Sequence, residues 1–115
     1  MSSPITTHVL DTANGRPATG VAVSLERQLP GGDWQTLGSG STDSDGRIGS
    51  LLADEAQVTP GTYRLNFDAG AYFAAQGTST LYGIIPIVFV IEKPQAHLHI
   101  PLLLSPFQYS TYRGS

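Results

Sequence analysis

The feature that most constrains this chain is a succession of short segments in which apolar and polar residues alternate. A period of two is typical of β-strands with one buried face, and the segments are separated by turns rich in Gly, Pro, Asn and Asp. The chain holds 13 Gly and 8 Pro among 115 residues, which favours many turns over long helices. The pattern predicts strands at residues 5–10, 21–27, 34–37, 62–67, 84–91, 96–104 and 108–112.

One segment, residues 68–77, has helical character: Asp68 can cap its start, alanines fill it and Gly77 can end it. Seven to eight short strands at near-regular spacing, with this single short helix, predict an all-β fold, an antiparallel β-sandwich. The length suits one domain over residues 1–115 with one hydrophobic core.

The charge balance and the missing cysteines exclude several classes of function. Six Lys and Arg against nine Asp and Glu give a formal charge of −3, and no basic cluster offers a surface for nucleic acid. Without cysteines there is no disulfide, no thiolate nucleophile and no Cys-ligated zinc. The first residues lack the basic and apolar regions of a signal peptide, and the most apolar run, residues 82–91, is too short and interrupted to span a membrane. We therefore expect a cytoplasmic protein.

The three histidines are the first candidates for chemistry. His97 and His99 are two residues apart and share one face of their strand, while the leucines between and beyond them take the core face. His8 lies on the face opposite Val9. Both strands therefore present imidazoles away from the core. The residues alone leave three interpretations open: solvated histidines without a role, a zinc site with one open position, or acid–base catalysis near neutral pH.

Arg47 and the chain end are the other candidates. Arg47 ends a turn formed by residues 42–46, and it is either a surface charge paired with a nearby Asp or a planar cation for an anionic or carbonyl-rich ligand. The closing Tyr-Arg-Gly-Ser, residues 112–115, is either an ordered terminus or a segment without a role. These residues indicate a β-sandwich with a His/Arg site, but they indicate no particular substrate.

Three motifs carry a family resemblance. The first is Thr-His-Val-Leu-Asp-Thr at residues 7–12, with Gly-Arg-Pro-Ala at 15–18, and the second is Thr-Asp at 42–43 with Asp-Gly-Arg at 45–47. The third is His-Leu-His-Ile-Pro-Leu-Leu-Leu-Ser-Pro at 97–106, with Tyr-Ser-Thr-Tyr-Arg-Gly-Ser at 109–115. With these motifs the chain resembles the 5-hydroxyisourate hydrolases of the transthyretin-like family from Ile5 to Ser115.

The resemblance implies a transthyretin-like sandwich that hydrolyses 5-hydroxyisourate to 2-oxo-4-hydroxy-4-carboxy-5-ureidoimidazoline in urate catabolism, with no metal and no other cofactor. It also implies a homotetramer, a dimer of dimers with sites at the subunit interfaces, which agrees with the 13% of charged residues. The implied catalytic residues, which also bind substrate, are His8, Arg47 and His99, and the further implied substrate-binding residues are Tyr112 and Ser115.

Two other functions compete with the hydrolase. A hormone-carrying transthyretin shares the fold but lacks the catalytic histidines and arginine, whereas this sequence has all three. A structural adhesion module would need no demanding chain end. Leu98, Gln108 and residues 81–86 depart from the hydrolase pattern and are expected to affect packing or the pocket wall. The resemblance leaves open which histidine is the general base.

Overall fold

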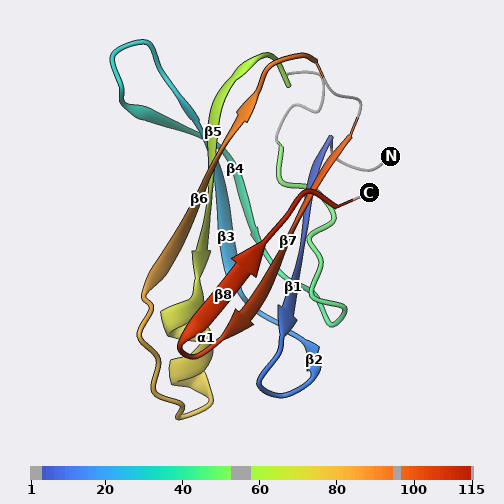
Figure 1. The fold of residues 1–115 in the computed structure, drawn as a ribbon, viewed down its shortest axis with the longest axis vertical. Helices are drawn as coiled ribbons and strands as arrows, with labels where there is room; N and C mark the ends of the chain where they lie inside the picture. Colours follow the sequence, from blue (N-terminus) through green and yellow to red (C-terminus); the bar gives the residue numbers. More distant parts are fainter. Residues whose placement is uncertain (1–3, 53–57, 95–96, 115) are drawn as a thin grey trace.

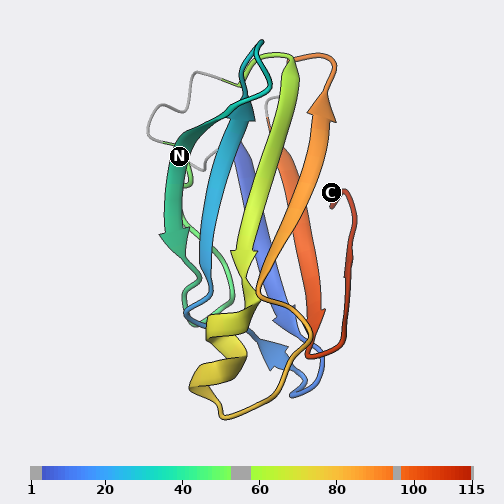
Figure 2. The same cartoon turned by 90° about the vertical axis from the view of Figure 1, so that its left-hand side faces the viewer.

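The computed structural model describes residues 4–52, 58–94 and 97–114, in which two four-stranded sheets pack face to face (Figures 1 and 2). The predicted all-β sandwich with one short helix is confirmed. Its elements are β1 (Ile5–Asp11), β2 (Arg16–Pro17), β3 (Ala22–Gln28), β4 (Trp34–Ser41), β5 (Gly61–Asp68), α1 (Ala69–Ala75), β6 (Ile84–Ile91), β7 (Leu98–Ser105) and β8 (Gln108–Thr111).

The first sheet has the order β2-β1-β7-β8, and the second sheet has the order β4-β3-β5-β6. All pairings are antiparallel except that of β1 with β7, which run parallel from Ile5 beside Leu98 to Asp11 beside Leu104. This one pair departs from the antiparallel prediction. A short hairpin loop forces neighbouring strands to run antiparallel, but β1 and β7 are separated in sequence by the whole second sheet.

The core lies between the sheets and is built from the alternate residues of each strand. Along β1 and β5 buried positions alternate with half-exposed ones, as the period of two predicts. The inner side chains are almost fully buried, among them Leu25, Tyr63, Phe67, Leu102 and Leu104. Each such apolar side chain stabilises the fold by about 1.5–3 kcal/mol relative to leaving it exposed. The alternate side chains are thereby held on the outer faces.

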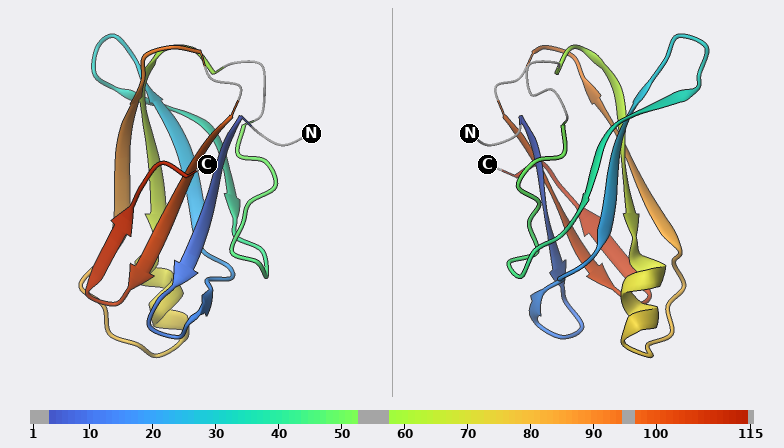
Figure 3. Two further views of the ribbon diagram at one scale, coloured as in Figure 1. Left: turned by 45° about the vertical axis from the view of Figure 1, so that its right-hand side comes forward. Right: turned by 180° about the vertical axis from the view of Figure 1, so that it is seen from behind.

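The helix α1 covers one end of the sandwich, opposite the β3–β4 hairpin (Figure 3). The Asp68 side chain caps its start by accepting a hydrogen bond from the Ala71 N–H at 3.0 Å, as predicted. Gly77 follows the helix with φ +68°, and the N–H of Thr78 donates to the Phe73 carbonyl at 2.9 Å. Glycine accommodates this left-handed turn without a steric penalty, so the helix ends where the sequence predicted.

Two strands differ from the sequence-based prediction. β4 continues through the small, polar residues 38–41, because backbone pairing with β3 compensates for their weak strand propensity. The two-residue β2 forms in a predicted loop by pairing Pro17 with Leu10 of β1. Pro86 lies in β6, an edge strand, where the missing N–H is tolerated, as expected. Within the described ranges, no helix is long and apolar enough to cross a membrane.

Candidate active site

The outer face of the first sheet carries the histidines. On β1 the half-exposed Thr6 and His8 alternate with buried residues, and on β7 the half-exposed His99 precedes the buried Ile100. The parallel register places Thr6 directly beside His99, although 93 residues separate them in sequence. The predicted outward direction of the imidazoles is therefore confirmed, and the pairing of β1 with β7 brings them together.

The turn before Arg47 docks against the same strand. His8 and Arg47 form an isolated antiparallel bridge, and the Val9 N–H donates to the Gly46 carbonyl at 2.8 Å. Gly46 has φ +77°, and a Cβ there would lie 2.4 Å from the Val9 carbonyl oxygen. Only glycine satisfies both demands. The turn therefore fixes Arg47 beside His8.

A carboxylate organises this turn from within. Oδ1 of Asp43 accepts hydrogen bonds from the N–H groups of Asp45 at 2.9 Å and Arg47 at 3.0 Å. The backbone hydrogen bond from Arg47, followed by that from Asp45, lowers the pKa of Asp43. No residue in the described ranges forms an ion pair with Arg47. Asp43 therefore holds the backbone of the turn, and the Arg47 guanidinium is not committed to a carboxylate.

Arg47 and His99 meet at one open pocket of about 490 Å³ on this face. Such a volume accommodates a small, flat, oxygen-rich molecule. His8 lies beside the pocket, next to Arg47, through the bridge between their backbones. The pocket wall includes Thr6, Asp43, Arg47, Ile48, His97 and His99.

The surroundings of two histidines favour the neutral ring at His99 and fix the direction of a hydrogen bond at His8. Burial lowers the pKa of His99, and the nearby charges of Arg47, His8 and His97 lower it further, so that His99 is neutral near pH 7. Nε2 of His8 lies 2.8 Å from the carbonyl oxygen of Asp45. Because a carbonyl only accepts, His8 donates from Nε2. Among the residues that the structure describes, no three His, Cys, Asp or Glu side chains are placed to hold a metal ion together.

The end of the chain returns to His99. The Gly114 N–H donates to the His99 carbonyl at 2.8 Å, and a Cβ on Gly114 would lie 2.6 Å from Cδ2 of the His99 ring. Glycine is therefore required where the terminal motif crosses the imidazole. Ser115, a predicted substrate-binding residue, lies outside the described residues.

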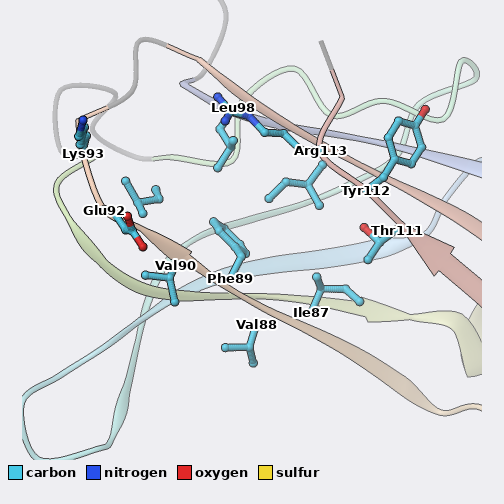
Figure 4. Close-up of a pocket in the computed structure, with 12 residues that line it drawn as sticks. Ile87, Val88, Phe89, Val90, Glu92, Lys93, Leu98, Thr111, Tyr112 and Arg113 are labelled. Atoms are coloured by element: carbon cyan, nitrogen blue, oxygen red, sulfur yellow. The ribbon is translucent and has the colours of Figure 1, made fainter.

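Tyr112 is not placed with Arg47 and His99 in the single chain. Tyr112 borders a separate apolar groove between β6 and the first sheet, and its 56% exposed side chain points away from Ile87 and Phe89 of β6 (Figure 4). In this groove Phe89 of β6 and Leu98 of β7 lie on the same side of the β6 ribbon, and Val88 lies on the other side (Figure 4). The groove is lined by a different set of residues from the His99 pocket.

Two residues at the pocket, Thr6 and His97, were not among the site residues that the family resemblance implied. The Thr6 hydroxyl oxygen lies 2.8 Å from Nδ1 of His99 and 2.9 Å from Nε2 of His97. Alternation in the sequence placed Thr6 on the face of His8, and spacing placed His97 on the face of His99. The contact between the two strands depends on their pairing, for which the sequence holds no local signal.

The fold and this site define a transthyretin-like β-sandwich, and comparison with known proteins agrees. The sequence model of the HIUase/Transthyretin family matches residues 5–114, and the chain belongs to this family. The 5-hydroxyisourate hydrolase of Mus musculus is 47% identical over 115 residues, which cover 99% of this chain and 97% of the mouse protein.

Two solved structures with different functions share this fold. The 5-hydroxyisourate hydrolase of Klebsiella pneumoniae superposes with a TM-score of 0.83 at 39% identity, covering 98% of this chain and 94% of that one. Sea bream transthyretin in complex with thyroxine superposes with a TM-score of 0.89 at 34% identity, covering 96% and 94%. Because a hydrolase and a thyroxine-bound transthyretin both fit this backbone, the side chains of the site must decide the activity.

Proposed function

We propose that this protein hydrolyses 5-hydroxyisourate to 2-oxo-4-hydroxy-4-carboxy-5-ureidoimidazoline, as a step of urate breakdown in the cytoplasm. The observation that carries the proposal is the meeting at one pocket of a neutral His99 and of Arg47, which forms no ion pair with any residue that the structure describes. A base and a fixed cation are what addition of water to a ring carbonyl requires. The similarity to curated 5-hydroxyisourate hydrolases supports this substrate.

His99 is the general base in this proposal. Its lowered pKa keeps the imidazole neutral near pH 7, and a neutral imidazole can take a proton from water. The water oxygen bonds to the ring carbonyl carbon, the cyclic C–N bond breaks, and the proton held by His99 passes to the leaving nitrogen. The products of this step are a carboxyl group and an N–H, so the step needs no cofactor.

Arg47 and His8 complete the catalytic set. The Arg47 guanidinium binds the carbonyl oxygens of the substrate and stabilises the negative charge that develops when water adds. His8 is oriented by the hydrogen bond that its Nε2 donates to the Asp45 carbonyl, which leaves Nδ1 as the ring nitrogen that contacts the substrate. Tyr112 and Ser115 bind substrate as well, and this part of the proposal depends on assembly, because Tyr112 is not in the wall of the His99 pocket in the single chain.

The assembly in this proposal is a homotetramer, a dimer of dimers with sites at the subunit interfaces. Both β6 and β8 are edge strands, and Ile84, Val88 and Val90 on β6 are 56%, 56% and 64% exposed. Exposed apolar edges of this kind favour pairing with another chain. Sedimentation velocity tests it: a tetramer is expected, and Val90→Glu should shift the protein toward smaller species. A monomeric wild type would contradict the assembly.

The test of the activity follows the ultraviolet decay of 5-hydroxyisourate made in place from urate by urate oxidase. We expect the protein to accelerate decay after treatment with a chelator, and His99→Ala to reduce kcat by about 10²- to 10⁴-fold, the usual contribution of a general base. Thr62→Ala on the outer face of the second sheet is the control and should retain the wild-type rate. Decay at the spontaneous rate with wild type would overturn the proposal and favour a ligand carrier.

A further inference from the structure

Thr6 connects two histidines across the first sheet. Its hydroxyl oxygen lies 2.8 Å from Nδ1 of His99 and 2.9 Å from Nε2 of His97. The two rings are nearly parallel, with an interplanar angle of 20° and centroids 6.3 Å apart. At this separation the rings do not touch face to face, and the hydroxyl is the group that links them.

The number of protons available for these two hydrogen bonds limits the tautomers that His97 and His99 can adopt. A threonine hydroxyl has one proton to donate and can also accept, so it can donate to only one of the two ring nitrogens. At least one ring must therefore present an N–H to Thr6. If His99 received the hydroxyl proton at Nδ1, its own proton would sit on Nε2. If His99 donates from Nδ1, its Nε2 keeps a lone pair.

Nε2 is the His99 nitrogen that remains for a ligand. Nδ1 is occupied by Thr6, and the ring carbon Cδ2 lies against Gly114. No hydrogen-bond partner of Nε2 is present in residues 4–52, 58–94 and 97–114. Only a His99 ring that donates to Thr6 from Nδ1–H keeps a lone pair on Nε2 with which to take a proton from water.

We propose that Thr6 is a positioning residue that accepts a hydrogen bond from Nδ1–H of His99 and donates to Nε2 of His97, so that Nε2 of His99 is held unprotonated in the pocket. The inference rests on the proposed function and deepens it, since it states how the base is kept in its active tautomer. His97 is a positioning residue in the same sense. It accepts the hydrogen bond from the Thr6 hydroxyl, and this fixes which way the hydroxyl points.

The hydrogen bond between Thr6 and His99 is also compatible with the protonated His99 ring. When His99 takes a proton at Nε2, its Nδ1–H bond to Thr6 is already formed and needs no rearrangement. The neutral and the protonated ring therefore keep the same contact, and the ring stays in place between water activation and proton return. The opposite direction would require the Thr6 hydroxyl to reorient, because a protonated ring has no acceptor nitrogen.

Thr6→Val tests the hydroxyl alone. Valine keeps the size and the β-branch that suit a strand, so we expect a folded protein. We expect kcat to fall about 10- to 100-fold, within the usual contribution of a general base, with KM nearly unchanged. Thr6→Ser restores the hydroxyl and should restore most of kcat. Thr12→Val makes the same chemical change, removes a hydrogen bond to the Leu104 carbonyl, and should leave kcat unaltered.

Long-range ¹H–¹⁵N NMR of the protein labelled with [¹⁵N]histidine measures the tautomer of each histidine directly. The chain has three histidines, so single substitutions assign every signal. We expect His99 to be protonated on Nδ1 in wild type and in Thr6→Ser, and to lose this preference in Thr6→Val. His99 protonated on Nε2 in the wild type would overturn the inference.

The kinetic comparison separates the two proposals. A wild-type protein that does not accelerate decay overturns the proposed function before any Thr6 variant is compared. An active wild type whose kcat is unchanged by Thr6→Val overturns only the role of Thr6. A Thr6→Val variant that raises KM at constant kcat also overturns it, because the hydroxyl would then bind substrate rather than orient the base.

Discussion

The outer faces of the two sheets both carry charged and polar side chains, but these side chains are used differently. On the second sheet, Nε of Arg64 donates to Glu26 at 2.7 Å, and its guanidinium lies 4.2 Å from the centre of the Trp34 ring. Asn66 donates to the same carboxylate. The charged groups of this face therefore satisfy one another.

On the first sheet the polar groups are oriented without being neutralised. Arg47 is held through its backbone by Asp43 and forms no ion pair within the described ranges. His99 is held through Nδ1 by Thr6. Side-chain type alone therefore does not identify a site. Charges that pair with one another stabilise the fold, whereas polar groups that are oriented but not paired can bind a ligand.

The largest expected effect comes from making the same change on both faces. Arg47→Met should lower kcat/KM about 10²- to 10³-fold, the usual loss when one donor to a developing oxyanion is removed. Arg64→Met should leave kcat/KM unchanged and lower the free energy of unfolding by about 1 kcal/mol, because it removes a half-exposed ion pair and a cation–π contact. Steady-state decay of 5-hydroxyisourate and urea unfolding measure the two. Equal losses of activity in the two variants would show that the outer faces of the two sheets do not differ in function.

A smaller loss of kcat is expected when a methyl group is added next to the His99 ring. Gly114→Ala places a carbon 2.6 Å from the His99 ring, so the ring must shift, and kcat should fall about 10- to 100-fold. Gly31→Ala, in the β3–β4 turn, meets no atom within 4 Å and should be silent. The same decay assay measures both variants. Full activity in Gly114→Ala would show that the position of the His99 ring is not critical.

The smallest effect is a difference in pH dependence. Burial lowers the pKa of His99 in the folded state below about 6.5, its unfolded value, so its contribution to stability is complete above that pH and is lost as the pH falls through the folded pKa. The hydrogen bond from Arg64 lowers the pKa of Glu26, so its contribution is lost only as the pH falls from about 4.3.

Urea unfolding from about pH 8 to about pH 3 separates these two windows. His99→Gln should reduce the slope just below about pH 6.5, and Glu26→Gln should reduce the slope below about pH 4.3, where the lowered pKa of Asp43 also contributes. The kcat/KM of the wild type should fall with pH in the upper window only, because His99 must be neutral to act. A fall of activity in the lower window alone would assign the base to a carboxylate.

Much of the fold was predictable because its signals are local. The period of two identified which residues of β1 point outward, so that His8 was correctly placed opposite Val9. The helix was predicted from Asp68 and Gly77, whose capping roles depend only on neighbours within a few residues. The position of Arg47 at the end of a turn was likewise a local inference.

The candidate site was less predictable because it depends on contacts between distant segments. Thr6 acquires its partner through the parallel pairing of β1 with β7, and no short loop in the sequence specifies that pairing. Tyr112 belongs to a motif shared with the family, yet in the single chain it does not line the pocket of Arg47 and His99. The terminal motif could be recognised, but the contact of Gly114 with His99 could not.

Alternation and turn chemistry are local properties of the sequence, so they were sufficient to predict the class of fold and the outward direction of the imidazoles. The family motifs predicted the set His8, Arg47 and His99, which stays a prediction. Only the tertiary structure decided which groups meet, since strand pairing joins residues 93 positions apart and is stabilised by the whole core. Burial and neighbouring charge then lower the pKa of His99, and neither quantity exists until the sheets have packed.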